Sequence, residues 1–191
     1  SYLSIYGARD VLLITWRAFR QHRMVRREIR HGGFSGEFPG GYVLLALHSQ
    51  PERTTDPDCG QWRDQYQFVA AVRGALDDAG FAETVLLVKE HPRQAPRGLP
   101  DIRQLHYRTK TFYRSLRALP GTQLLPMQQS MEELVGRASL VATPNGSLAW
   151  IGMTNGVPAL TARPTWFSEC TATLTIDHVT KEPRLLRELM H

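Results

Sequence analysis

The chain has 191 residues, 42% of them hydrophobic, and a formal net charge of +5 with a pI of about 9.6. This length suits one compact domain with a substantial apolar core. No run of about 20 apolar residues occurs, which argues against a membrane-spanning helix, and the first residues lack the order of a secretory signal.

The excess of basic residues favours an anionic partner, such as a nucleotide, an anionic glycan or a membrane surface. A nucleic acid is disfavoured, because no nucleic-acid-binding motif is present. Cys59 and Cys170 lie far apart without metal-ligand spacing, so we expect free thiols in a reducing, cytoplasmic compartment. No cluster of His, Cys, Asp and Glu has metal-ligand spacing, and no metal site is predicted.

Residues 10–31 alternate apolar side chains with arginines, which predicts one or two amphipathic helices with basic residues outside. We interpret the basic side as the solvated face of a packed helix. A helix on a membrane surface is the alternative, because Trp16 and Phe19 beside basic residues suit that role. Residues 31–41 are Gly-rich and predict a linker. We therefore expect residues 1–40 to be a helix and linker from a preceding domain, and residues 41–191 to form a second domain.

From residue 42 onward, short apolar runs alternate with helical patterns. The predicted strands cover residues 42–47, 85–88, 122–125, 139–142, 158–161 and 174–176. The predicted helices cover residues 61–79 and 109–119, a segment opening at 130, a segment from 147 to about 155, and residues 182–190. Strands that alternate with helices are typical of βαβ units. The sequence therefore predicts an α/β fold, a Rossmann-like and mostly parallel sheet flanked by helices.

Polar residues follow three of the predicted strands. They are His48 and Glu52 after the first, Lys89, Glu90, His91 and Pro92 after the second, and Thr143, Asn145, Gly146 and Ser147 after a later one. Ligands of parallel sheets bind at the carboxyl ends of strands, so we expect these residues to share one site. The alternative is that each group is an ordinary polar strand end or helix cap.

The turn at Gly146-Ser147 leads from a strand into a helix, where free N–H groups favour a phosphate. His48 and Glu52 suit an acid–base pair or a ribose contact, although a histidine in such a place is more often structural. Ser130-Met-Glu-Glu133 fits a capping box, and a phosphate contact at Ser130 would be an additional role. The glycine motifs of dinucleotide folds and P-loops are absent, as is the nucleophile elbow of hydrolases.

Several segments, taken in order, resemble the bacterial capsule-polysaccharide synthesis family, which includes retaining β-Kdo transferases with GT-B architecture. The segments are 42–55, Val88-Lys-Glu-His-Pro92, Phe112-Tyr113, Ser130-Met-Glu-Glu-Leu134, 141–150 and Asn155-Gly-Val-Pro158. The most specific parts are His48-Ser-Gln-Pro-Glu52 and the Lys-Glu-His-Pro segment. The family usually carries Glu-Ala after the Trp, where this chain has Ile151-Gly152, and often a Thr where this chain has Asn145.

The resemblance implies the carboxy-terminal GT-B half, which holds the sugar nucleotide, without the N-terminal acceptor domain. The CMP-sugar would be a substrate, and no separate cofactor is expected. The implied phosphate ligands are His91 and Pro92, together with Ser130, Thr143 and Ser147. His91 would stabilise the leaving phosphate, Lys89 would add positive potential, and Glu90 would hold the imidazole or the ribose.

The expected partners are a nucleotide sugar and a glycan or glycolipid acceptor, with peripheral contact to the inner membrane as a further option. Two other functions stay open on sequence grounds. One is a UDP-sugar transferase or an epimerase-like GT-B domain. The other is a non-catalytic basic module that binds an anionic glycan.

Overall fold

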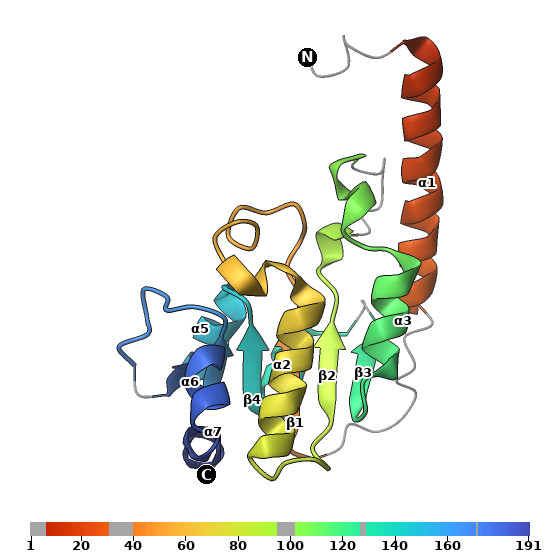
Figure 1. Cartoon of the computed structure of the whole chain (residues 1–191). Helices are drawn as coiled ribbons and strands as arrows, with labels where there is room; N and C mark the ends of the chain where they lie inside the picture. Colours follow the sequence, from red (N-terminus) through yellow and green to blue (C-terminus); the bar gives the residue numbers. More distant parts are fainter. Residues whose placement is uncertain (1–6, 31–39, 95–101, 127–128, 171) are drawn as a thin grey trace.

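A computed structural model describes residues 7–30, 40–94, 102–126, 129–170 and 172–191 (Figure 1). Its centre is one six-stranded sheet with the order β3-β2-β1-β4-β5-β6, in which every neighbouring pair is parallel. The strands are β1 (Tyr42–Ala46), β2 (Leu86–Lys89), β3 (Thr122–Leu125), β4 (Ala138–Thr143), β5 (Ala159–Thr161) and β6 (Thr173–Thr175). This arrangement confirms the predicted Rossmann-like α/β fold.

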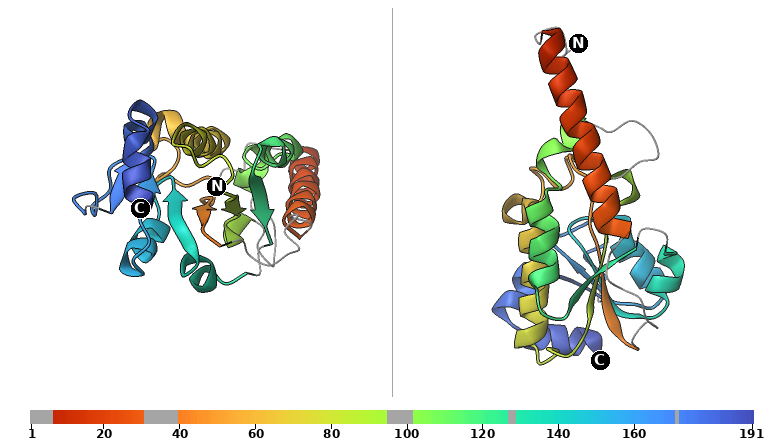
Figure 2. Two further views of the ribbon diagram at one scale, coloured as in Figure 1. Left: turned by 90° about the horizontal axis from the view of Figure 1, so that it is seen from below. Right: turned by 90° about the vertical axis from the view of Figure 1, so that its right-hand side faces the viewer.

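Helices cover both faces of the sheet (Figure 2, left). One face carries α1 (Ala8–Arg30), α2 (Gln65–Asp78), α3 (Lys110–Ala118), α6 (Ile176–Lys181) and α7 (Arg184–Met190), and the other carries α4 (Met131–Val135) and α5 (Ser147–Thr154). Three 3-10 turns complete the described elements: η2 (Gly60–Arg63), η3 (Pro92–Gln94) and η4 (Ile102–His106).

The two apolar cores follow from the alternation of side chains along each strand. Val43 and Leu45 of β1 pack with α2 and α3, whereas Leu44 packs with α4 and α5. Both faces of the central strands are thus buried, which is why their sequences are continuous apolar runs.

Two predicted element boundaries were wrong. The helix predicted over 61–79 is divided, because the side chain of Asp64 caps α2 by accepting from the backbone N–H of Tyr66 at 2.9 Å. The strand predicted over 174–176 ends at Thr175, and the buried Ile176 begins α6, an element that the sequence reading missed. The β-branched Ile176 has a strand's propensity but packs as a helical core residue, so tertiary packing overrides propensity here.

The capping box predicted at Ser130 was also wrong. Ser130 is the N-cap of α4, but its side chain makes no capping hydrogen bond. The short helix is held instead by the buried Leu134 and Val135 and by Tyr42, whose hydroxyl donates to the carbonyl of Leu134 at 2.6 Å.

A single helix, α1, occupies residues 8–30, and its second half packs into the domain. Val25 and Ile29 join the larger core, and the side-chain amide of Gln21 donates to the carbonyls of Gln104 and Arg108 at 3.0 and 2.9 Å. Among the described helices, none is long and apolar enough to cross a bilayer. The predicted linker lies mainly in residues 31–39, outside the described residues, and the division into 1–40 and 41–191 stays a prediction.

Candidate functional site

The neighbouring strands β1 and β4 mark the point where the strand order reverses. The chain continues from β1 to β2 on one side of β1, while β4 lies on the other side. At such a switch point the connections leave in opposite directions and open a crevice at the carboxyl ends of the strands. His48 follows β1 and Thr143 ends β4, and His48 Nε2 lies 3.0 Å from Thr143 Oγ1.

A cavity of about 520 Å³ opens at this point. Its volume is in the usual range for small-molecule sites. It is lined by Ala46, Leu47, His48, Glu52, Thr54, His91, Pro92, Met131, Thr143, Asn145, Gly146, Ser147, Leu148 and Ile151. The structure therefore brings together predicted residues from three separate strand ends.

A second cavity of about 410 Å³ lies between the N-terminal ends of α2 and α3. It is lined by residues such as Tyr66, His106 and Phe112, and by none of the predicted site residues. We place the candidate site in the first cavity, because only that one combines the switch point with both imidazoles.

The start of α5 forms one wall of the candidate site. Gly146 is the N-cap of this helix, and no side chain caps it. A Cβ atom at Gly146 would lie 2.6 Å from His48 Nε2 and 2.8 Å from Thr143 Oγ1, so only glycine fits without a shift. The first N–H groups of a helix lack intrahelical acceptors and favour an anion.

His48 is held in the site as a neutral imidazole. Its side chain is 11% exposed, and its Nδ1 has no hydrogen-bond partner but lies 3.7 Å from Glu52 Oε2. Burial, followed by the charges of His91 and Arg108, lowers the pKa of His48 to about 4. At neutral pH the ring therefore carries no charge, and its Nδ1 faces the carboxylate of Glu52.

This lowered pKa predicts that acid weakens the fold. Between the ordinary pKa of 6.5 and about 4, the unfolded chain binds a proton at His48 that the folded chain does not. Stability is thus lost as the pH falls, and we expect the free energy of unfolding to drop by about 2 kcal/mol between pH 7.5 and pH 5. Urea denaturation at pH 7.5 and at pH 5 measures this change in the free energy of unfolding.

The variant His48→Gln should lose most of this pH dependence, whereas His178→Gln, at an exposed helical position, should keep it. His91 contributes in the same direction, because its burial also lowers its pKa. If the free energy of unfolding of His48→Gln falls with pH as steeply as that of the unchanged chain, His48 is not the responsible group.

His91 presents a hydrogen-bond donor to the same cavity. Its Nδ1 accepts a hydrogen bond from the backbone N–H of Arg93 at 3.1 Å. In a neutral ring the proton is then on Nε2. His91 is half-buried and lines the cavity, so this Nε2–H is available to a bound phosphate or carboxylate.

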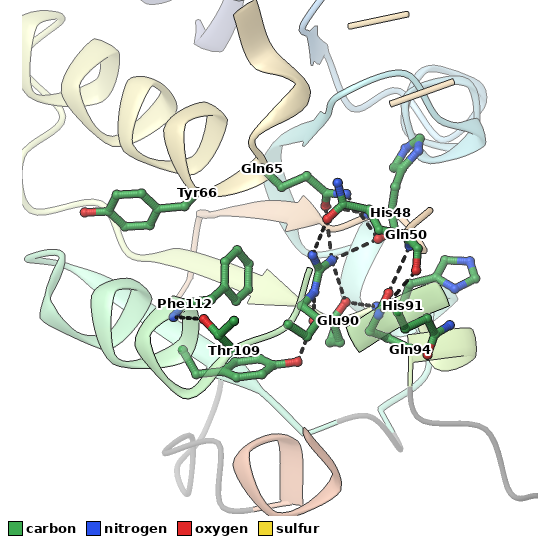
Figure 3. Close-up of polar contacts among 12 residues, drawn as sticks. His48, Gln50, Gln65, Tyr66, Glu90, His91, Gln94, Thr109 and Phe112 are labelled. Carbon is green, nitrogen blue, oxygen red and sulfur yellow. Dashed lines mark hydrogen bonds and ion pairs between the residues drawn. The ribbon is translucent and has the colours of Figure 1, made fainter. Parts of the chain in front are cut away.

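A buried polar network supports the loops that carry both imidazoles (Figure 3). At its centre is Arg108, which is fully buried. Its Nε donates to Glu90 Oε2 at 2.6 Å, its Nη1 to Gln50 Oε1 at 2.6 Å, and its Nη2 to the carbonyl of His48 at 2.9 Å. The guanidinium group of Arg108 thus joins the segments after β1 and β2 to the segment that leads into α3.

The structure places Glu90 inside the protein rather than in the cavity. Its side chain is 0% exposed and does not line the cavity. It accepts from Arg108, from the Tyr113 hydroxyl at 2.9 Å and from the backbone N–H of His91 at 2.9 Å. Glu90 therefore positions the backbone of His91 from outside the cavity.

Lys89 and Ser130 are also absent from the cavity lining. Lys89 is the last residue of β2 and is 4% exposed, and burial lowers its pKa. Ser130 is exposed at the start of α4, where its neighbour Met131 lines the cavity instead. The Lys89 side chain contributes no wall to the site.

The positioning residues Arg108, Gln50 and Gln65 were missed by sequence reasoning. Gln65 holds the backbone of His48, accepting from its N–H at 2.8 Å and donating to its carbonyl at 3.2 Å. The available signal was indirect: Phe112-Tyr113 belongs to the resembling segments, and Tyr113 contacts this network. Arginine and glutamine are mostly surface residues, so the burial of these three side chains could not be deduced from the sequence.

No protein-family model and no curated protein matches this sequence. Solved structures do. The UDP-GlcNAc 2-epimerase of Methanocaldococcus jannaschii, in complex with UDP-GlcNAc and UDP, has a TM-score of 0.54 at 16% identity, over 94% of this chain and 45% of that protein. A second structure of this enzyme gives 0.56 at 15% identity, over 89% and 42%.

The Thermosulfurimonas dismutans KpsC β-Kdo 2,7 transferase has a TM-score of 0.50 at 12% identity, over 86% of this chain and 46% of that protein. At such low identity these likenesses show the fold. The chain spans less than half the length of these proteins. It has the Rossmann-like α/β fold of one part of these larger proteins.

Proposed function

We propose that this chain is the donor-binding half of a bacterial glycosyltransferase of capsule or lipopolysaccharide synthesis, with a CMP-sugar, Kdo above all, as donor. The observation that carries the proposal is the cavity at the switch point. There two imidazoles of lowered pKa, a buried threonine hydroxyl and an uncapped helix start surround one space. The β-Kdo transferase of similar fold supports this donor class.

We propose that the phosphate of the donor binds at the start of α5. The N–H groups of this first turn and the hydroxyl of Ser147 suit its oxygens. His91 Nε2–H donates to the phosphate as the bond between the sugar and the CMP oxygen breaks, which stabilises the charge on the leaving group. Glu52, 3.7 Å from His48 at the rim of the cavity, completes an acid–base pair.

The donor's ribose meets a different wall from the one that the family resemblance implies. Ile151 lines the cavity where the resemblance places a glutamate. The next residue is Gly152, and a larger residue does not fit there, because a Cβ atom would lie 2.3 Å from Val141 Cγ2 of β4. We therefore expect weak nucleotide binding by this chain, and no sugar transfer without an acceptor domain.

A UDP-sugar transferase or an epimerase-like domain is the second candidate. The fold likeness to a UDP-GlcNAc 2-epimerase favours it. A phosphate at the start of α5 suits either nucleotide, so the choice of base depends on the rest of the cavity. A non-catalytic module for an anionic glycan is the third candidate, supported by the net charge of +5.

A thermal-shift screen of this chain with CMP, UDP, GDP and CMP-Kdo separates these candidates. A ligand that binds the folded state at 100 times its Kd adds about 2.7 kcal/mol of stability. We expect CMP and CMP-Kdo to raise the melting temperature by several degrees at saturation. A rise with UDP alone would favour the second candidate. No rise with any nucleotide, but a rise with an anionic glycan, would favour the third.

A further inference from the structure

The outer side of α1 exposes large apolar side chains in its first half. Leu12 is 71% exposed, Leu13 45%, Trp16 54% and Phe19 40%. Leu12, Trp16 and Phe19 are one or two helical turns apart and form a contiguous strip. Figure 2 (right) shows this part of α1 extending beyond the sheet domain, with no other described element over its outer side.

Helix geometry separates this strip from the packed side of α1. The buried residues Ala18, His22, Val25 and Ile29 recur at intervals of three and four. The outer side carries Leu12, Trp16, Phe19, Arg20, Arg23, Arg27 and Arg30, each of which lies three or four residues from another member of the set. Apolar residues thus occupy the first half of the outer side, and arginines continue it in the second half.

Charge on α1 is one-sided. All seven of its arginines are exposed, and the guanidinium of Arg20 lies 4.6 Å from the ring centre of Trp16. The two acidic residues, Asp10 and Glu28, are five turns apart at 3.6 residues per turn and share one flank. Glu28 on that flank pairs with Arg117 of α3. The outer side therefore combines apolar and cationic groups without a carboxylate.

We propose that the outer side of α1 docks on an anionic lipid bilayer. Leu12, Trp16 and Phe19 enter the interface between headgroups and acyl chains, and the arginines contact lipid phosphates. Charge complementarity favours this occupant, because the surface presents only cations beside its apolar strip. Docking leaves the packed side of α1 in place, so it requires no rearrangement of the domain.

This docking would hold the candidate site near the membrane. The N-terminal end of α1 extends past the carboxyl edge of the sheet, which is the edge that carries the cavity (Figure 1). The inference stands on α1 alone and is independent of which nucleotide the cavity takes.

Vesicle co-sedimentation of the full chain tests the proposal. We expect binding to vesicles of phosphatidylcholine and phosphatidylglycerol, and at least tenfold weaker binding to phosphatidylcholine alone. Two triple variants should each bind the anionic vesicles at least tenfold more weakly: Leu12→Ser, Trp16→Ser, Phe19→Ser, and Arg20→Glu, Arg23→Glu, Arg27→Glu. The first keeps every charge, so its loss reports insertion beyond simple charge attraction.

Matched controls carry the same changes elsewhere. Trp166→Ser, at a side chain that is 78% exposed, and the triple variant Arg53→Glu, Arg163→Glu, Arg187→Glu should bind within twofold of the unchanged chain. Should a triple variant fail to fold, quenching by brominated lipid decides: the unchanged chain should be quenched, and Trp16→Phe much less.

Three results would overturn the proposal. One is no binding of the unchanged chain to anionic vesicles. Another is binding that survives both α1 variants. The third is a dimer in light scattering without vesicles that the apolar triple variant converts to a monomer, since the strip would then be covered by a second copy.

Discussion

Replacing Arg108 with alanine is expected to lower the free energy of unfolding by about 3–5 kcal/mol, because a buried ion pair loses one partner and leaves the other charge uncompensated. The side chains of Arg108 and Glu90 are both 0% exposed. The loss also removes the donors for Gln50 Oε1 and for the carbonyl of His48. Urea denaturation at pH 7.5 measures the change.

Arg73→Ala is the matched control for removing a buried guanidinium. Arg73 is 3% exposed but pairs with Asp77, whose side chain is 50% exposed and is hydrated once released. We therefore expect a smaller loss, of about 1–3 kcal/mol from its hydrogen bonds. Equal losses in Arg73→Ala and Arg108→Ala would contradict the special role of the Arg108–Glu90 pair.

The double variant Arg108→Met, Glu90→Leu separates charge from positioning. Removing both charges should recover part of the stability that Arg108→Ala loses. Recovery should be incomplete, since the Tyr113 hydroxyl and the backbone N–H of His91 lose their acceptor. Nucleotide binding by a well-folded double variant that is weaker than binding by the unchanged chain would show that the network positions the site.

Local pattern was sufficient to predict the fold. The strand Tyr42–Ala46 is a short apolar run between turn residues, and the alternation of such runs with helices leaves few topologies. Predicted helix and strand boundaries were wrong where a capping side chain or core packing overrode local propensity, as at Asp64 and Ile176. These outcomes depend on contacts between distant segments, which a single sequence does not show.

The sequence predicted many of the residues that line the candidate site, but not the buried network that holds them in position. Residues at the carboxyl ends of parallel strands must meet, and His48, His91 and Thr143 do line one cavity. The adjacent Glu90 turns inward, because successive residues of an extended chain point to opposite sides. Its partner Arg108 lies 18 residues further along the chain, and only the folded structure reveals that pair.

His91→Ala is expected to weaken CMP binding by roughly 10- to 150-fold, the loss of one hydrogen bond to a charged group, about 1.5–3 kcal/mol. The reason is the Nε2–H of His91, which faces the cavity while Nδ1 accepts from Arg93. Isothermal titration at pH 7.5 measures the change in Kd. The sign of the effect should not reverse at lower pH, because burial keeps the ring neutral to below its ordinary pKa.

His91→Gln distinguishes a donor from a merely structural residue. The side-chain amide of glutamine places an N–H near the position of Nε2, so this variant should recover part of the affinity that His91→Ala loses. His106→Ala, at an exposed residue of the second cavity, is the matched control and should bind as the unchanged chain does. A loss in His91→Ala that His91→Gln partly restores would identify the imidazole as a hydrogen-bond donor to the nucleotide. Unaltered CMP affinity in His91→Ala would place the phosphate elsewhere.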